Sequence, residues 1–148
     1  MKKLGVLIVC AAFLAGCGGS KTIKEGKVKD TIEEKQVSDR YITVIGIGAA
    51  AADITNETQK KASSRNAAVV AAQYQLVSML KGVKIQGGVT IEKAVETDSK
   101  IKAIVDDSIV GAEIVKSEWT SDGGCVITLR LDKEGLAQKL GVKFEEEK

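Results

Sequence analysis

Few residues in this sequence have the type and the spacing that catalysis requires. Ser78 and Lys81 match a Ser-x-x-Lys motif, in which an amine lies one helical turn from a nucleophilic hydroxyl. In enzymes that use this motif it begins a helix, whereas here it ends an expected helix and no Lys-Thr-Gly motif follows. We therefore expect a solvated helix end, with a cation near the negative pole of the helix dipole. The sequence also contains no histidine, which excludes Ser-His triads, histidine zinc ligands and histidine acid–base relays.

Two acidic neighbours and one cysteine also have a chemical interpretation. Asp106 and Asp107 could act as an acid–base pair or as calcium ligands, but neighbours on a helix diverge by about 100° and no ligand-spaced loop surrounds them. We expect them on a solvated face. Cys125 could be a redox thiol, but it alternates with apolar residues in the run Cys125–Leu131. That position predicts a buried, unreactive side chain.

The segment Val44-x-Gly46-x-Gly48-x-x-Ala51 is similar to a dinucleotide-binding fingerprint. That fingerprint requires the next helix to begin directly at the glycines, so that its N-terminus meets the pyrophosphate. Here residues 50–55 separate the glycines from the expected helix cap, Asn56. We expect the glycines to allow close packing of a helix on the strand. The sequence thus predicts no catalytic residue, no cofactor site and no metal site.

The N-terminal residues carry the clearest functional signal. Lys2 and Lys3 precede a 13-residue apolar run, residues 4–16, which is too short to span a bilayer core of about 30 Å but suits a secretory signal peptide. The run ends at Leu14-Ala15-Gly16-Cys17, which resembles the lipobox of bacterial lipoproteins. The resemblance implies cleavage between Gly16 and Cys17 and lipidation of Cys17. Gly18, in place of an aspartate, favours the outer membrane of a two-membrane bacterium.

Removal of the signal changes both the charge and the cysteine content of the chain. The net charge of +2 equals the contribution of Lys2 and Lys3, so the mature chain is formally neutral and gives no reason to expect nucleic-acid binding. Cys10 leaves with the signal, and lipidation consumes Cys17. Cys125 is then the only free thiol, so no disulfide within the chain is expected.

The mature chain divides into three parts. Residues 17–40 are rich in charge, which predicts the lipidated cysteine and a solvated tether. Residues 41–141 are expected to form a globular domain, and residues 142–148 an acidic tail that is mobile at Glu145-Glu146-Glu147. Within the domain, residues 41–50 predict a buried strand. Asn56 predicts the cap of a long helix that reaches about Leu80 and is closed by Gly82. This helix, residues 57–80, could bind a partner, but its Ala and Val residues favour an intramolecular core.

The second half of the domain is expected to complete a small sheet. Residues 83–95 alternate between apolar and polar, which predicts a one-sided strand with a bend at Gly87-Gly88; a hairpin turn there is the alternative. The remaining elements are expected in the order helix 98–109, strand 112–120, turn 121–124, strand 125–131 and a last helix capped by Asp132 and ended by Gly141. This order predicts an α+β domain with a small, mostly antiparallel sheet and the long Ala-rich helix on one face.

Several of these segments together resemble the LPP-twenty lipoprotein family. They are the lipobox, the charged tether, Gly46-Ile47-Gly48-Ala49, the helix motif Arg65-x-Ala67-Ala68-x-x-Ala71-Ala72-x-x-x-Leu76, and the hairpin from Trp119 through Cys125–Leu131. Members of that family are small bacterial envelope lipoproteins, some of them surface antigens and some accessory to the flagellar basal structure. The resemblance implies an outer-membrane-anchored α+β domain without known catalysis. Members that form rings suggest self-association here.

The sequence therefore predicts a lipid-anchored cell-envelope lipoprotein with a structural or interaction role, which the family links to outer-membrane or flagellar-associated assemblies. Its expected partners are the membrane, through the lipid on Cys17, and either further copies of itself or another envelope protein. We expect it at the outer membrane, on the periplasmic face or the cell surface. The alternative is a periplasmic small-ligand-binding module, which needs a concave apolar pocket. A hydrolase is less favoured, because it needs a residue such as Ser78 in a cleft.

Overall fold

The structure, a computed structural model, describes residues 36–38 and 40–145. The expected signal peptide, the cleavage site between Gly16 and Cys17, the lipidated Cys17 and most of the tether lie outside these residues. The described elements, in chain order, are β1 (Gln36–Val37), β2 (Tyr41–Gly48), α1 (Glu57–Gly82), β3 (Lys84–Ile85), β4 (Val89–Thr90), α2 (Ile91–Thr97), α3 (Ser99–Val110), β5 (Glu113–Trp119), β6 (Cys125–Asp132) and α4 (Lys133–Leu140).

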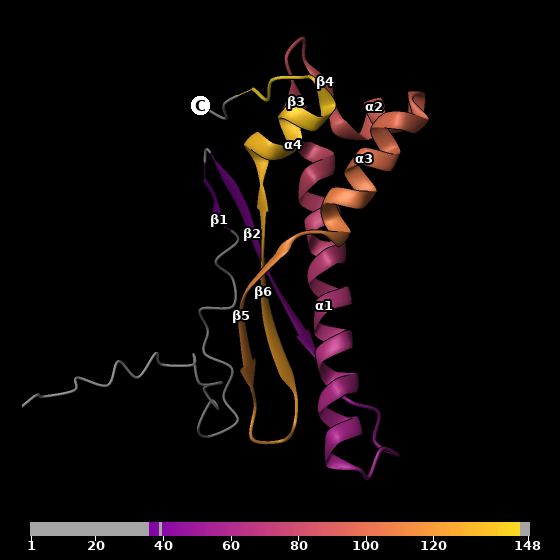
Figure 1. The fold of residues 1–148 in the computed structure, drawn as a ribbon, viewed down its shortest axis with the longest axis vertical. Coiled ribbons are helices and arrows are strands. Elements are labelled where there is room, and N and C mark those ends of the chain that lie inside the picture. Colours follow the sequence, from indigo (N-terminus) through magenta and orange to yellow (C-terminus); the bar gives the residue numbers. More distant parts are fainter. Residues whose placement is uncertain (1–35, 39, 146–148) are drawn as a thin grey trace, which may run out of the picture.

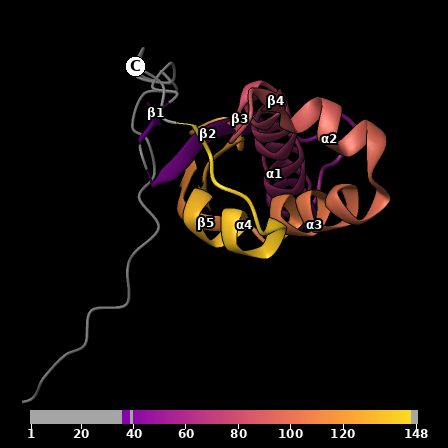
Figure 2. The ribbon, with the colours of Figure 1, turned by 90° about the horizontal axis from the view of Figure 1, so that it is seen from above.

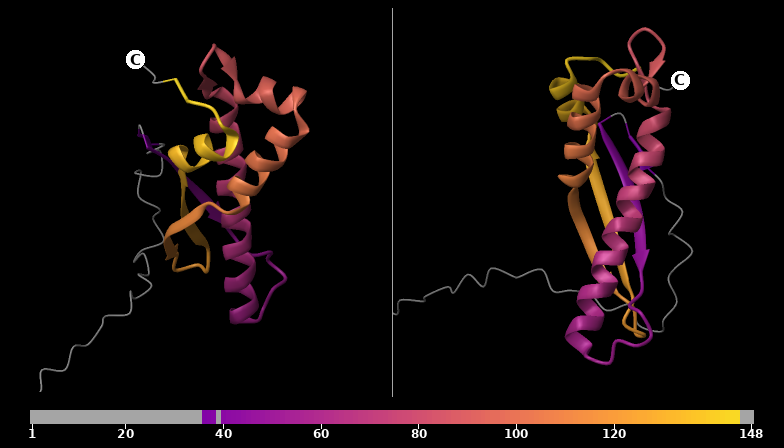
Figure 3. Two further views of the ribbon diagram at one scale, coloured as in Figure 1. Left: turned by 45° about the horizontal axis from the view of Figure 1, so that its top comes forward. Right: turned by 90° about the vertical axis from the view of Figure 1, so that its right-hand side faces the viewer.

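The fold is α+β, as the sequence predicts. An antiparallel sheet in the order β1-β2-β6-β5 has the long helix α1 packed along one face (Figures 1 and 3). The shorter helices α2, α3 and α4 gather around the end of the molecule that holds the C-terminus of α1, as the view from above shows (Figure 2). The predicted packing of one Ala-rich helix on a small sheet is confirmed.

The core lies between α1 and the two central strands. Strands β2 and β6 pair in register from Tyr41 opposite Asp132 to Gly48 opposite Cys125. Because side chains alternate across a strand, one residue in two faces the helix. The buried apolar residues on this face of the two strands are Ile42, Val44, Cys125, Ile127, Leu129 and Leu131.

Helix α1 begins as predicted, with the Asn56 side chain accepting hydrogen bonds from the amides of Thr58 and Gln59 at 3.0 and 3.1 Å. Its buried face is Ser64, Ala68, Ala72, Leu76 and Leu80. The helical spacing in the sequence predicts a stripe of Ala62, Arg65 or Asn66, Val69, Ala72, Leu76 and Leu80. The last three are buried as predicted, whereas Ala62, Arg65, Asn66 and Val69 are not. The buried residues recur every four positions. The prediction was wrong in the first half of the helix, because small residues occupy several of its faces. The helix also continues through Gly82.

The prediction of one strand over residues 83–95 is wrong, and the alternative hairpin is correct. Gly87 and Gly88 have φ of +105° and +76°, which glycine adopts without strain, and they join β3 to β4. Thr90 then caps α2, its hydroxyl accepting from the Lys93 amide at 3.4 Å. The apolar residues at 91, 94 and 95 fit a helix as well as a strand, and the short segment leaves this choice to tertiary packing.

Both expected domain boundaries shift outward. Strand β1 lies within the segment expected to be tether, and it pairs with β2 at Ile42 and Thr43. At the other end, Phe144 forms a bridge with Ile85, and the Glu145 amide donates to the Lys84 carbonyl at 2.9 Å. Residues 142–145 therefore belong to the folded domain rather than to the expected acidic tail, because Phe144 packs against the core.

Candidate functional sites

The backbone of α1 fills the space beside the two glycines of the fingerprint-like segment. A Cβ atom at Gly46 would lie 2.1 Å from the Ala68 carbonyl oxygen, and one at Gly48 would lie 2.2 Å from the Ala68 nitrogen. Real Cβ atoms do not approach other atoms so closely. The predicted close helix–strand packing is confirmed, because backbone atoms of α1 fill the space beside both glycines.

The Ser-x-x-Lys residues do not form a cleft. Ser78 is exposed on the outer side of α1, and the Lys81 ammonium lies 3.4 Å from a carboxylate oxygen of Glu92. Neither Ser78 nor Lys81 lines either of the two cavities described below. The geometry therefore offers no site in which Lys81 could activate Ser78.

The adjacent aspartates are exposed and face different partners. Asp106 pairs with Lys102 one turn earlier in α3, and Asp107 lies 3.8 Å from the Lys139 ammonium on α4. Within residues 36–38 and 40–145, no three acidic or cysteine side chains are grouped so that they could hold a metal ion. The predicted solvated face is observed for both residues.

Cys125 lies at the centre of the core, with no exposed surface. Burial raises the pKa of its thiol, because the charged thiolate would have to leave water, and the charge of Arg65 opposes this effect only in part. A thiol whose pKa is raised is a poor nucleophile at neutral pH. The predicted buried, unreactive cysteine matches this environment.

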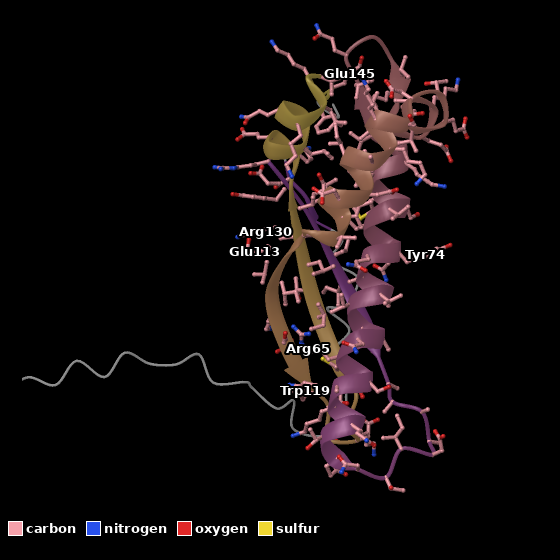
Figure 4. The ribbon with its side chains drawn as sticks, turned by 45° about the vertical axis from the view of Figure 1, so that its right-hand side comes forward. Arg65, Tyr74, Glu113, Trp119, Arg130 and Glu145 are labelled. Atoms are coloured by element: carbon pink, nitrogen blue, oxygen red, sulfur yellow. The ribbon has the colours of Figure 1, made fainter. Side chains whose placement is uncertain are left out.

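A first cavity, of about 330 Å³, lies where α3 and α4 meet the ends of β5 and β6. Its rim holds Arg130, whose guanidinium is 2.7 Å from Glu113 and stacks 4.7 Å from the centre of the Tyr41 ring; Figure 4 shows Glu113 and Arg130 side by side. The hydrogen bonds that Arg130 donates to the Glu113 carboxylate raise the pKa of Arg130, so this cation stays charged. Ser108 lines the cavity at 6% exposure, and its hydroxyl has no hydrogen-bond partner among the residues that the structure describes.

A second cavity, of about 360 Å³, lies at the opposite end of the molecule, beside the first turns of α1 and the β5–β6 turn. The Lys61 ammonium lies 6.0 Å from the centre of the Trp119 ring, a cation–π distance. Asp122 in the turn accepts a hydrogen bond from the Thr120 hydroxyl, and this bond is the main cause that lowers the pKa of Asp122. The Lys60 charge contributes to the same effect. These carboxylate and ammonium groups balance one another, so the cavity is not strongly selective for charge.

The outer side of α1 is the largest feature that the site predictions missed. Val70 and Tyr74 are 63% and 77% exposed, and Tyr74 points away from the sheet into solvent (Figure 4). The sequence carries a signal for this surface, because no residue from Asn66 to Leu80 is charged. The sequence favours an intramolecular core for the apolar residues of this helix, with partner binding as the alternative, whereas the structure divides them between a buried face and an exposed one.

The chain matches no protein-family model, no curated protein and no solved structure. Among the described residues, no helix combines the length and the apolar character needed to cross a membrane. The similarity to LPP-twenty lipoproteins therefore stays a prediction that rests on the motifs quoted above.

Proposed function

We propose that this chain is a lipid-anchored lipoprotein of the bacterial cell envelope, whose α+β domain has a structural or interaction role. The observation that carries the proposal is the order of residues 1–17, in which a basic start and an apolar run lead to Leu14-Ala15-Gly16-Cys17. Each buried methylene of a lipid contributes about 0.8 kcal/mol, so several acyl chains on Cys17 would hold the domain at a membrane stably. Gly18 favours the outer membrane.

The described domain supports an interaction role in two ways. Four constellations have a catalytic or cofactor-binding interpretation. They lie at the close contact between β2 and α1, on exposed sides of α1 and α3, and in the core, rather than in a common cleft. In addition, α1 exposes two large apolar side chains, Val70 and Tyr74, which are available for contact with another protein. A flagellar-associated assembly is the specific setting that the family resemblance adds to this proposal.

Metabolic labelling with a fatty acid tests the anchor. The wild-type chain is expected to carry label and to sediment with outer membranes, whereas Cys17→Ala should carry none, because it lacks the acceptor thiol. Cys10→Ala is the matched control, since it removes a thiol from the same signal segment and should leave labelling unchanged. Equal labelling of the wild type and Cys17→Ala would overturn the proposal.

A periplasmic small-ligand-binding module is the second candidate, and the unpartnered Ser108 hydroxyl in the first cavity favours it. A buried hydroxyl without a partner costs about 1–3 kcal/mol, which a ligand with an accepting group would recover. Titration with short-chain fatty alcohols, followed by amide NMR spectra, tests this candidate. Saturable shifts confined to Ser108 and Gly111–Glu113, and absent in Ser108→Ala, would support it. Chemical-shift changes that do not saturate and that spread over the surface would exclude a binding site for fatty alcohols.

A further inference from the structure

The second cavity contains the only tryptophan of the chain, Trp119. This residue ends β5 and lies opposite Cys125 of β6. Residues opposite one another on paired strands point to the same face of a sheet, so Trp119 lies on the face that α1 covers. Its ring packs against the core and also lines the cavity beside the first turns of α1 (Figure 4). The core therefore holds a flat aromatic surface in place at the wall of this cavity.

Polar groups surround this aromatic surface. Glu57 and Lys61, in the first turns of α1, line the cavity and form no ion pair among the residues that the structure describes. Ser121, in the β5–β6 turn, is exposed, and its hydroxyl can both donate and accept. The rim of the cavity thus presents a carboxylate, an ammonium and a hydroxyl to a ligand.

The charges of the lining favour a neutral ligand. Its two cations, Lys60 and Lys61, are balanced by the carboxylates of Glu57 and Asp122, so neither an anion nor a cation is attracted by a net charge.

An aromatic surface with a polar rim suits a pyranose sugar, which has a face of C–H groups and an edge of hydroxyls. The cavity volume of about 360 Å³ lies at the lower end of the range for small-molecule sites. We propose that the second cavity binds a neutral pyranose sugar, which stacks on Trp119 and forms hydrogen bonds with Glu57, Lys61 and Ser121.

The Lys61 side chain leaves room for this stacking. Its ammonium lies 6.0 Å from the centre of the Trp119 ring, at the outer limit of a cation–π contact. Lys61 is exposed and has a flexible stem, so the ammonium can turn to the edge of a bound sugar and donate to a hydroxyl. The cell-envelope location proposed above would bring the cavity near glycans, but sugar binding itself does not depend on the lipid anchor.

Tryptophan fluorescence tests the proposal, because Trp119 is the only tryptophan and its emission reports on this cavity alone. The full chain, purified from cells in a polyoxyethylene detergent that contains no sugar, is titrated with chitotriose, maltotriose or inorganic phosphate. At least one trisaccharide should change the fluorescence saturably at millimolar concentrations, and phosphate should not. A saturable change with phosphate, or none with either sugar, would overturn the proposal. Tighter binding of chitotriose would support it and identify N-acetylated amino sugars as the ligand, whereas tighter binding of maltotriose would support it and identify plain glucans.

Two variants test the contacts within the cavity. Glu57→Ala should weaken binding of the sugar by about tenfold, the loss expected for one hydrogen bond to a charged group. Glu134→Ala is its matched control, because Glu134 is also an exposed glutamate in the first turn of a helix and lies outside the cavity. Equal affinity of Glu57→Ala and the wild type would overturn the assigned contact and the proposal with it.

Trp119→Leu keeps an apolar side chain against the core but removes the aromatic surface. Calorimetric titration, which needs no tryptophan, should show no sugar binding by this variant, and circular dichroism shows whether it is folded. Tyr74→Ala is the control, since it removes an aromatic side chain that is 77% exposed and lies outside the cavity. Sugar binding that survives in folded Trp119→Leu, or that is lost in Tyr74→Ala, would overturn the proposal.

Discussion

At the scale of single residues, the contact between β2 and α1 depends on the absence of side chains. Gly46 and Gly48 let the helix backbone approach the strand, and Ala68 and Ala72 keep the helix surface thin enough to use that space. Ser64 adds a polar link, because its hydroxyl lies 2.7 Å from both the Lys60 and the Gly123 carbonyl oxygens. This hydroxyl joins α1 to the β5–β6 turn at a fully buried position.

Gly46→Ala is expected to destabilise the domain by at least about 2–3 kcal/mol, because the added methyl must displace the backbone of α1. Urea unfolding followed by circular dichroism measures the change. Gly82→Ala is the control, since a Cβ there meets no atom within 4 Å, and it should be neutral or slightly stabilising. Equal stability of Gly46→Ala and the wild type would show that α1 does not pack on β2 in this way.

The lowered pKa of Asp122 predicts a pH dependence for the β5–β6 turn. The Thr120 hydroxyl and the Gly124 amide both bond to the carboxylate form, so this form is favoured in the folded chain. The stabilisation is present above the ordinary pKa of an aspartate, and it is lost as the pH falls through the lowered value. NMR titration of the Asp122 carboxyl should show a midpoint that rises in Thr120→Val. An identical Asp122 titration midpoint in the wild type and Thr120→Val would show that the Thr120 hydrogen bond does not lower this pKa.

At the scale of elements, side-chain caps and glycine turns define where helices and strands begin and end. Asp132 accepts from the Glu134 amide at 3.1 Å and starts α4, and Gly141 ends α4 with φ of +68°. Gly123, with φ of +87°, closes the β5–β6 turn. The segment after Gly141 then returns to the β3–β4 hairpin, so the C-terminal residues hold two distant parts of the chain together.

Deletion of residues 142–148 is expected to destabilise the domain by about 2–3 kcal/mol, because it removes the packing of Phe144 and the hydrogen bonds to β3. Thermal unfolding measures the loss of stability. Amide hydrogen exchange at Gln86, whose amide donates to the Lys143 carbonyl at 2.7 Å, should accelerate. Deletion of residues 146–148 alone serves as the control and should change neither. Unaltered exchange at Gln86 in the longer deletion would refute the pairing.

At the scale of the whole molecule, one apolar core supports the fold and the charges remain at the surface. The ion pairs among the described residues join largely exposed side chains, so each contributes little to stability. Burial of apolar residues between α1, the sheet and the shorter helices is therefore the main source of stability. Cys125 lies inside this core, and its thiol reports on the opening of the whole domain.

Maleimide labelling of Cys125 is expected to be slow in the native protein and to accelerate with urea in parallel with global unfolding, because the thiol is fully buried and its pKa is raised. Ser78→Cys provides an exposed thiol on the same chain and should react at once. Rapid modification of Cys125 without denaturant would show that the core opens locally.

Much of the fold follows from local patterns. The caps at Asn56 and Asp132, the Asp122-Gly123 turn and the alternation in Cys125–Leu131 each depend on neighbours within a few residues, and all are observed. Predictions failed where two local structures fitted equally well. Residues 83–97 fit either one strand or a hairpin followed by a helix. The packing of Ile91 and Ala94 into the core decided between these two structures.

The sequence by itself determined the α+β class and the absence of histidine chemistry, and it predicts the lipid anchor at Cys17, because each of these depends on residue types and short spacings. Only the tertiary structure decided which side of α1 is buried. Alanine, valine and serine occur around the whole helix, so helical spacing alone cannot select a face. The glycines of β2 make that selection, since they admit the backbone at Ala68 and Ala72 and leave Val70 and Tyr74 exposed to solvent.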